Sequence, residues 1–283
     1  MQGSLITKSN NSFWPNGWRS RTCIMGVLNV TPDSFSDGGL YIKVKEATQR
    51  ATELLVQGAD VIDIGAQSTR PNADIVGSEE ELRRLIPVLS SVRSKHPEAI
   101  ISIDTFHSNV AKEALNLGAN WINDVTGGRY DPDILKVVAE AECPYVLMHS
   151  RGNSRTMDSL NNYKNIVIDV KNEMLMATEI AFKQGVKKNN LIWDLGLGFA
   201  KSTEQNITLL RAISFFTEEE FPILLGPSRK RFIGEILNQK IPESRIWGTT
   251  AISCLCQKDN VSIIRVHDVD AVYQTLLMAQ YIF

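Results

Sequence analysis

Short apolar runs alternate along the chain with longer segments in which apolar residues recur every three or four positions. The short runs are almost continuously apolar, which is typical of strands covered on both faces in a parallel sheet. The longer segments have the spacing of helices that bury one face. Eight strands are predicted, at residues 23–30, 59–64, 100–104, 121–124, 144–149, 191–194, 222–226 and 262–267.

Two of the predicted helices have recognisable first residues. Ser78 and Glu81 have the spacing of a capping box, and Pro87 is expected to kink the helix that follows them. Asp268 is expected to cap the last helix. The apolar stripes of three helices are Leu82, Leu85, Ile86, Leu89 and Val92; Ile166, Val170, Met174, Ala177 and Ala181; and Val269, Val272, Leu276 and Ala279.

Eight strand–helix units without a break in composition predict an α/β fold, namely a closed (β/α)8 TIM barrel in one domain over residues 23–283. An open, doubly wound sheet is the alternative architecture for the same alternation. Residues 1–22 precede the first unit. We expect them to form an N-terminal extension that closes the bottom of the barrel.

Composition and charge narrow the class of protein. Apolar residues make up 43% of the chain and charged residues 22%, which is ordinary for a globular domain. The net charge of -2 gives no sign of a nucleic-acid or membrane-surface partner. No apolar run approaches the roughly 20 residues of a membrane span, and the polar start of the chain does not resemble a signal peptide.

The cysteines predict a reducing environment. They lie in or beside apolar runs and have no metal-binding spacing, so we expect reduced thiols in a cytoplasmic protein. The four cysteines are Cys23, Cys143, Cys254 and Cys256.

Nearly every predicted strand ends in a polar or charged side chain. In a barrel of parallel strands these ends meet at one mouth, where enzymes with this architecture have their active sites. Buried charges persist there only if they are paired or bind a ligand. The strand-end residues are Asn29, Asp63, Asp104, Asn123, Asp124, His149, Asp194, Arg265 and His267, with Lys230 just beyond the seventh strand.

Two of the segments near this mouth suit an anion. The loops at residues 31–39 and 67–72 are expected to cover the mouth. Arg70, with the Thr69 hydroxyl beside it, suits bidentate capture of a phosphate or carboxylate. The run from Ser228 to Lys230 leads from the seventh strand into a helix whose free N–H groups can bind an anion.

The motifs around these residues resemble those of the dihydropteroate synthases. Residues 25–39 (MGVLNVTPDSFSDGG) resemble the first signature of that family, and residues 63–71 (DIGAQSTRP) resemble the second. The resemblance runs from about residue 23 to the end of the chain. Six shorter motifs follow in the family's order: SIDT at 102–105, INDV at 122–125, LMH at 147–149, GLGF at 196–199, SRK at 228–230 and RVHD at 265–268.

The resemblance implies an enzyme of folate biosynthesis. Such a transferase joins 6-hydroxymethyl-7,8-dihydropterin pyrophosphate to para-aminobenzoate and releases pyrophosphate. It is usually a homodimeric barrel, and sulfonamides inhibit it by mimicking para-aminobenzoate. The pterin ring is then expected to bind Asp104, Asn123, Met148, Asp194 and Lys230, with Asp194 accepting two parallel N–H bonds.

The same resemblance implies sites for the other reactants. Pyrophosphate is expected on Arg265, His267, Thr69, Arg70 and Asn29, and Asn29 is expected to reach a Mg²⁺ ion bound to its oxygens. Para-aminobenzoate is expected in a slot formed by Phe35, Pro71, Phe199 and Ser228.

The implied mechanism is dissociative. Pyrophosphate leaves first, and the resulting pterin methylene cation is stabilised by carboxylates before the neutral aniline nitrogen attacks it. The catalytic residues are then Asp63, Asp104, Lys230 and Arg265, with Asp194 adding its charge.

The chain departs from the family pattern at several positions. Ala66 and Gln67 stand where Gly-Glu is usual, Asn72 replaces a glycine, and Leu195 and Ala200 interrupt the usual pattern after the sixth strand. Three alternatives remain open at this point: a pterin-binding methyltransferase domain, a pterin-binding paralogue without turnover, and a purely structural barrel.

Overall fold

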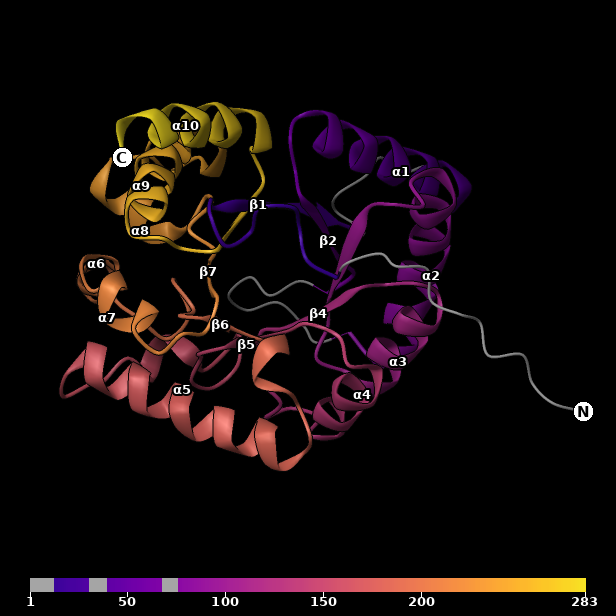
Figure 1. Cartoon of the computed structure of the whole chain (residues 1–283), viewed down its shortest axis with the longest axis horizontal. Coiled ribbons are helices and arrows are strands. Elements are labelled where there is room, and N and C mark those ends of the chain that lie inside the picture. Colours follow the sequence, from indigo (N-terminus) through magenta and orange to yellow (C-terminus); the bar gives the residue numbers. More distant parts are fainter. Residues whose placement is uncertain (1–12, 31–39, 68–75) are drawn as a thin grey trace, which may run out of the picture.

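Eight parallel strands close into a barrel in the computed structural model, which describes residues 13–30, 40–67 and 76–283. Each strand pairs with its neighbours in chain order, and β1 pairs with β8 (Figure 1). The predicted (β/α)8 barrel is therefore confirmed, and the open-sheet alternative is wrong. The strands are β1 (Cys23–Asn29), β2 (Val61–Gly65), β3 (Ile100–Asp104), β4 (Trp121–Asp124), β5 (Tyr145–Met148), β6 (Leu191–Asp194), β7 (Ile223–Leu225) and β8 (Ile263–Val266).

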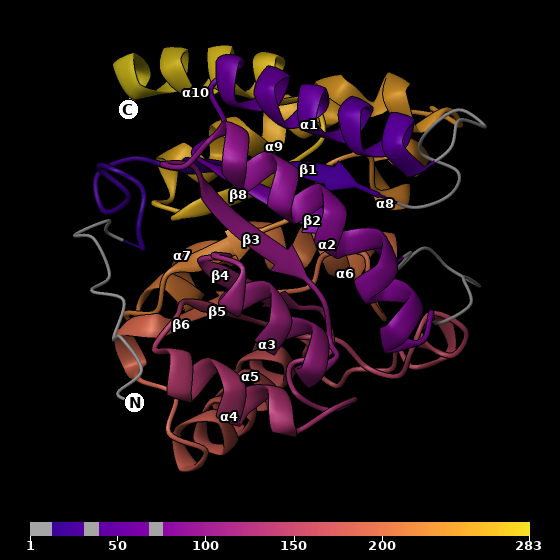
Figure 2. The same cartoon turned by 90° about the vertical axis from the view of Figure 1, so that its right-hand side faces the viewer.

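Helices surround the barrel on the outside, and Figure 2 shows α1, α2 and α3 following one another along one side. The α-helices are α1 (Leu40–Val56), α2 (Ser78–Lys95), α3 (Ser108–Asn116), α4 (Asp133–Ala141), α5 (Ile166–Lys183), α6 (Thr203–Arg211), α7 (Ile213–Thr217), α8 (Arg231–Ile236), α9 (Ile246–Lys258) and α10 (Val269–Ile282). Short 3-10 helices are η2 (Met157–Ser159), η3 (Lys188–Asn190) and η4 (Pro242–Arg245).

The strands divide their apolar side chains between two cores, because successive side chains point to opposite faces of a strand. The larger core lies between the barrel and the helices and includes Ile24, Ile62 and Ile122. The smaller core fills the lower interior of the barrel. Its buried members are Cys23, Met25, Val61, Trp121, Val146, Ile192, Leu224 and Ile263.

Residues 13–18 cover the bottom of this smaller core. Trp14 and Trp18 stack with ring centroids 4.2 Å apart and pack against it. The indole N–H of Trp121 donates to the backbone carbonyl of Phe13 at 2.5 Å, which satisfies a buried donor. The segment before β1 thus excludes water from the lower end of the barrel.

One of the two predicted helix caps is wrong, and the other has the predicted residue without its side-chain bond. The N-cap of α2 is Gly77, Ser78 is already helical, and Glu81 is buried where the side-chain amide of Gln67 donates to it at 3.0 Å. Asp268 is the N-cap residue of α10, as predicted, but its carboxylate accepts two bonds from Arg229 instead of bonding the N–H groups of the helix. The side chains of Glu81 and Asp268 thus bond distant residues instead of the local backbone.

Candidate active site

The upper half of the barrel interior is polar because the inward-facing side chains of the strands are apolar in the lower half and mostly polar towards the carboxyl ends. Side chains two residues apart on a strand point to the same face. Asp63 therefore faces inward like Val61, Asn123 like Trp121 and Asp194 like Ile192. In the same way, Met148 faces inward like Val146 and Arg265 like Ile263. The strand register therefore gathers these side chains at the carboxyl end of the barrel.

A cavity of about 1220 Å³ opens at this end. Its wall includes the predicted site residues Asn29, Asp104, Phe199, Ser228, Lys230, Arg265 and His267. A smaller cavity of about 520 Å³ lies beside Trp18 and Arg21, and none of the predicted site residues lines it. The larger cavity is therefore the candidate active site.

An arginine between two aspartates forms the charged centre of this site. Arg265 donates from Nε to Asp63 at 2.6 Å and from Nη2 to Asp104 at 2.7 Å. Asn123 donates to the same oxygen of Asp63 at 3.1 Å. The other oxygen of Asp63 is buried without a hydrogen-bond partner in the part of the chain that the structure describes. With both carboxylates ionised, the cluster carries an excess of negative charge.

Burial controls the charges of this cluster. It raises the pKa of Asp104 to about 7, Arg265 acts in the opposite direction, and the nearby Asp63 carboxylate raises it further. Burial by itself lowers the pKa of Arg265, but Asp63 and Asp104 outweigh it and raise that pKa above its usual value. The guanidinium therefore stays charged while one of its carboxylate partners titrates near neutral pH.

Asp194 and Lys230 form the second part of the site. One Asp194 oxygen accepts from the backbone N–H of Gly196 at 2.8 Å, and burial raises the pKa of this carboxyl. Burial lowers the pKa of Lys230 to about 8, while Asp194 opposes that shift. The Lys230 ammonium lies 4.1 Å from the centre of the Phe199 ring. A cation, a carboxylate and an aromatic face are thus available to one flat polar ligand.

Ser228 and His267 contact each other above β8. The Ser228 hydroxyl accepts from the His267 backbone N–H at 3.1 Å and lies 3.0 Å from the ring nitrogen Nδ1. Burial and the charge of Arg265 lower the pKa of His267 to about 3, so the ring is neutral. Helix α8 begins at Arg231, so the run from Ser228 to Lys230 leads into this helix as predicted, and anion binding by its N–H groups stays a prediction.

Four predicted site residues lie outside the residues that the structure describes: Phe35, Thr69, Arg70 and Pro71. Asn123 and Met148 are buried in the barrel interior, and Asn29 is half-buried at the end of β1. The roles assigned to all of these residues remain predictions.

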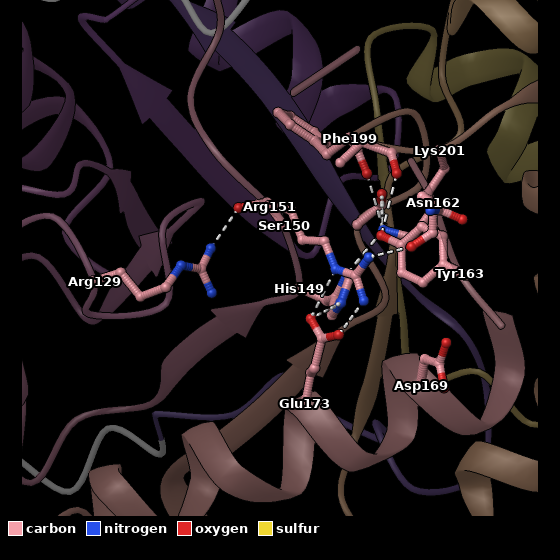
Figure 3. Close-up of polar contacts among 12 residues, drawn as sticks. Arg129, His149, Ser150, Arg151, Asn162, Tyr163, Asp169, Glu173, Phe199 and Lys201 are labelled. Carbon is pink, nitrogen blue, oxygen red and sulfur yellow. Dashed lines mark hydrogen bonds and ion pairs between the residues drawn. The ribbon is translucent and has the colours of Figure 1, made fainter. Parts of the chain in front are cut away.

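The structure also reveals polar residues that the sequence motifs did not single out. Lys201 is buried beside His149, and Glu173 and Arg151 extend the same cluster (Figure 3). Gln67, already noted as a departure from the family pattern, accepts from the N–H of Val76 and donates to the Val76 carbonyl and to Glu81. The only sequence signal for Lys201 was its place just after the motif at 196–199.

The barrel with carboxylates, cations and an aromatic wall at its mouth defines an enzyme of the pterin-binding class. The family model described as "Pterin binding enzyme" matches residues 25–267, and the chain belongs to this family. In the part of the chain that the structure describes, no helix has the length and apolar character needed to cross a bilayer.

Within that class, several of the similar proteins are dihydropteroate synthases. The dihydropteroate synthase of Synechocystis sp. is 44% identical over 262 residues, which are 93% of this chain and 90% of that protein. The structure of the Xanthomonas albilineans enzyme with 4-aminobenzoic acid has a TM-score of 0.87 and 39% identity, and covers 93% of both chains. The Yersinia pestis enzyme in a sulfonamide complex has a TM-score of 0.87 and 36% identity, covering 93% of this chain and 94% of that one. The chain is a transferase of folate biosynthesis that forms 7,8-dihydropteroate from the pterin pyrophosphate and para-aminobenzoate.

Proposed function

We propose that this chain forms dihydropteroate by a dissociative substitution at the barrel mouth. The observation that carries the proposal is the placement of Asp104, Lys230 and Arg265 in the wall of one cavity, with Asp63 bonded to Arg265 and Asp194 buried at the same end of the barrel. The Asp194 carboxylate suits the donor edge of a pterin. In the Arg265–Asp63–Asp104 cluster, the guanidinium can bind a diphosphate and the carboxylates can stabilise a positive charge.

Asp194 and Lys230 bind the pterin ring in this proposal. The pterin edge presents two N–H donors in parallel, and a carboxylate accepts both. Asn123 and Asp104 bond the remaining ring positions, Lys230 donates to a ring acceptor, and Met148 packs on the ring face. Support comes from Asp104 and Lys230 in the cavity wall and from Asp194 and Asn123, which are buried at the same end of the barrel. A site with such buried polar groups favours a ligand whose donors and acceptors match them.

The diphosphate binds to cationic and neutral donors on the β8 side of the mouth. Arg265 keeps its charge, and the neutral ring of His267 contributes an N–H, with Thr69 and Arg70 completing the site as predicted. Departure of the diphosphate leaves a methylene cation on the pterin. The carboxylates of Asp63 and Asp104 stabilise that cation, and Asp194 adds its charge. The aniline nitrogen, which is neutral near pH 7, then attacks.

Mg²⁺ is the metal that suits the residues at this mouth. Over the described residues, no three His, Cys, Asp or Glu side chains gather in an arrangement that could hold a metal ion. An ion that keeps most of its waters and takes phosphate oxygens as ligands therefore fits better than one that needs a full protein cage. Asn29, in the cavity wall, offers an amide oxygen. When bound, the ion supplies charge neutralisation for the departing diphosphate.

Para-aminobenzoate binds against Phe199 and Ser228, with Phe35 and Pro71 completing the slot. The half-buried Phe199 ring in the cavity wall supports this placement. The Yersinia pestis relative binds a sulfonamide, and we propose the same class of inhibitor for this slot. We also propose a cytoplasmic location, which the free thiols of all four cysteines support.

Release of pyrophosphate tests the function. Wild-type protein is expected to release pyrophosphate from 6-hydroxymethyl-7,8-dihydropterin diphosphate in proportion to dihydropteroate, and only when para-aminobenzoate is present. Tight binding of the pterin diphosphate without release would point to the paralogue without turnover. Weak binding of that ligand would contradict the site itself.

The metal proposal predicts a Mg²⁺ requirement that Asn29 tunes. EDTA is expected to reduce turnover at least about tenfold, and Mg²⁺ to restore it. Asn29→Ala is expected to raise the Mg²⁺ concentration for half-maximal rate roughly tenfold, equivalent to about 1.4 kcal/mol. The exposed Asn189, beside the smaller cavity, provides the control variant Asn189→Ala. An unchanged Mg²⁺ dependence in Asn29→Ala would remove this residue from the metal site.

We propose that the enzyme is a homodimer through α8, α9 and α10, which lie together on one side of the barrel (Figure 1). Several large apolar side chains are exposed there, an unusual concentration for a monomer surface. Trp247 is 77% and Met278 60% exposed, and Leu277, Tyr281 and Phe283 accompany them.

Charge on this face is expected to dissociate the dimer. Trp247→Glu combined with Met278→Glu should convert a dimer to a monomer in analytical ultracentrifugation, because two buried, unpaired charges cost several kcal/mol. Met176 on α5 is 58% exposed, so Met176→Glu is the matched control and should leave the dimer intact. A monomeric wild-type protein would exclude the proposal.

A further inference from the structure

We propose that Lys201 is a positioning residue whose ammonium fixes the loop at residues 195–201. His149 and Glu173 support the ammonium in turn. The loop forms the cavity wall beside Lys230. The loop connects β6 to α6, and Figure 3 shows the polar contacts around it. The consequence for para-aminobenzoate depends on the proposed function, because it assumes that Phe199 lines the slot of that substrate.

The backbone of this loop adopts a conformation that needs support. Gly196, Gly198 and Ala200 have positive φ angles of 64°, 78° and 49°. Alanine is disfavoured in the left-handed region, so Ala200 stays there only if surrounding contacts hold it. A Cβ at Gly196 would lie 1.8 Å from the carbonyl oxygen of His149, so the loop presses directly on the end of β5.

Lys201 supplies the central support. Its ammonium has three hydrogen-bond partners: the carbonyl of Gly196 at 3.0 Å, the carbonyl of Phe199 at 3.0 Å and the ring nitrogen Nδ1 of His149 at 2.9 Å. An ammonium has three N–H groups and no acceptor, so these partners use its full donor capacity. The side chain is only 5% exposed, so water cannot replace these bonds readily. Both ends of the turn are thereby tied to one atom.

His149 transmits this interaction to α5. Because Nδ1 accepts from Lys201, the ring proton lies on Nε2 and donates to Glu173 at 3.1 Å. Burial, together with the charge of Lys201, lowers the pKa of His149 to about 4, so the ring is neutral. A neutral imidazole can thus accept on one side and donate on the other, which couples the Glu173 carboxylate to the Lys201 ammonium without direct contact.

The chain of contacts returns to the loop by a second route. Glu173 pairs with Arg151, and the Arg151 guanidinium lies 3.8 Å from the centre of the Tyr163 ring. The Tyr163 hydroxyl donates to the carbonyl of Ala200 at 3.1 Å. The contacts therefore form a closed ring, which constrains the loop from both sides. Its members in order are Lys201, His149, Glu173, Arg151, Tyr163 and Ala200.

The constrained loop fixes the geometry of the catalytic cavity at three points. Gly196 donates to Asp194, Gly198 lies so close to the Lys230 stem that a Cβ there would be 3.0 Å from it, and the Phe199 ring faces the Lys230 ammonium. Burial lowers the pKa of Lys201 to about 7, with Asp194 and Glu173 opposing this shift and Lys230 and Arg151 adding to it. The charge of Lys201 thus depends on the carboxylates on both sides of the loop.

Hydrogen exchange and steady-state kinetics of full-length variants test the proposal. Lys201→Met keeps the length of the side chain and removes all three donors. We expect exchange of the amides at residues 195–201 to accelerate at least about tenfold. We expect KM for para-aminobenzoate to rise roughly tenfold while kcat changes less than about threefold. Glu173 is only half-buried on α5, so Glu173→Gln is available even if Lys201→Met does not fold. This variant should change both quantities in the same direction by a smaller factor.

The control is Lys187→Met, which removes an exposed lysine paired with Glu142 and should change neither quantity. The double variant Lys201→Met/Glu173→Gln should be no worse than Lys201→Met, because the two residues act through one chain of contacts. Unchanged exchange in Lys201→Met, or fully additive effects in the double variant, would overturn the proposal. Faster exchange with an unchanged KM would support the loop anchor and contradict the placement of Phe199 in the para-aminobenzoate slot.

Discussion

Replacing Asp194 by asparagine is expected to weaken binding of the pterin diphosphate roughly 100-fold or more, equivalent to about 3 kcal/mol or more. In the protein, one Asp194 oxygen already accepts from Gly196, which fixes the orientation of the carboxylate. In Asp194→Asn the amide oxygen would keep that bond and the NH₂ group would face the ligand. A donor would then meet the donors of the pterin edge, and both sides would remain unsatisfied.

Isothermal titration calorimetry with the pterin diphosphate measures this loss. The control is Asp133→Asn on the exposed first turn of α4, which should bind like the wild type. An affinity of Asp194→Asn within about threefold of the wild type would show that the pterin edge binds elsewhere, and the proposed function would lose its main support.

Replacing Arg265 by methionine is expected to lower kcat/KM by a factor of roughly 1000 and to destabilise the fold by about 3–5 kcal/mol. The methionine leaves Asp63 and Asp104 facing each other without the cation that both now bond. It also removes the charge that receives the diphosphate. Arg21→Met is the matched control, because Arg21 forms a two-bond pair with Asp60 away from the active-site cavity. That variant should lose stability and keep its activity, whereas equal activities of the two variants would contradict the role of Arg265.

The same variant has a pH signature whose sign follows from Asp104. The pKa of Asp104 in the folded protein, about 7, lies above the usual value of 3.8, so the stability that this carboxyl contributes is present below pH 4 and is lost as pH rises through 7. Activity follows the opposite course, because the ionised carboxylates stabilise the cation. We expect kcat/KM of the wild type to rise with pH up to about 7. In Arg265→Met the rise should move to higher pH, because Arg265 is what holds this pKa down. A pH profile of the variant that matches the wild type would exclude titration of this pair.

The barrel and most of its polar mouth could be predicted from the sequence. The strands at residues 100–104, 121–124 and 191–194 agree with the structure residue for residue, because each is a short apolar run that ends at a polar side chain. The others differ by one or two residues at their ends. Asp63, Asp194 and Arg265 could be placed together because parallel strands bring their carboxyl ends to the same edge.

Side-chain partners could not be predicted in this way. Ser78 and Asp268 follow local capping rules, yet Gly77 takes the cap of α2 and Arg229 takes the Asp268 carboxylate. Lys201 finds its partner His149 more than fifty positions away in the chain. Sequence spacing indicates how a residue lies within its own helix or strand. It carries no information about which side chain of another element bonds that residue in the folded protein.

By itself the sequence determined the order of strands and helices and which side chains end the strands, because periodicity and strand polarity are properties of local chain geometry. Tertiary structure alone decided that Arg265 joins Asp63 to Asp104, that Lys201 anchors the loop after β6, and which carboxylates titrate near neutral pH. These outcomes depend on distances of a few ångströms between residues far apart in the chain, and on burial, which only the closed barrel creates.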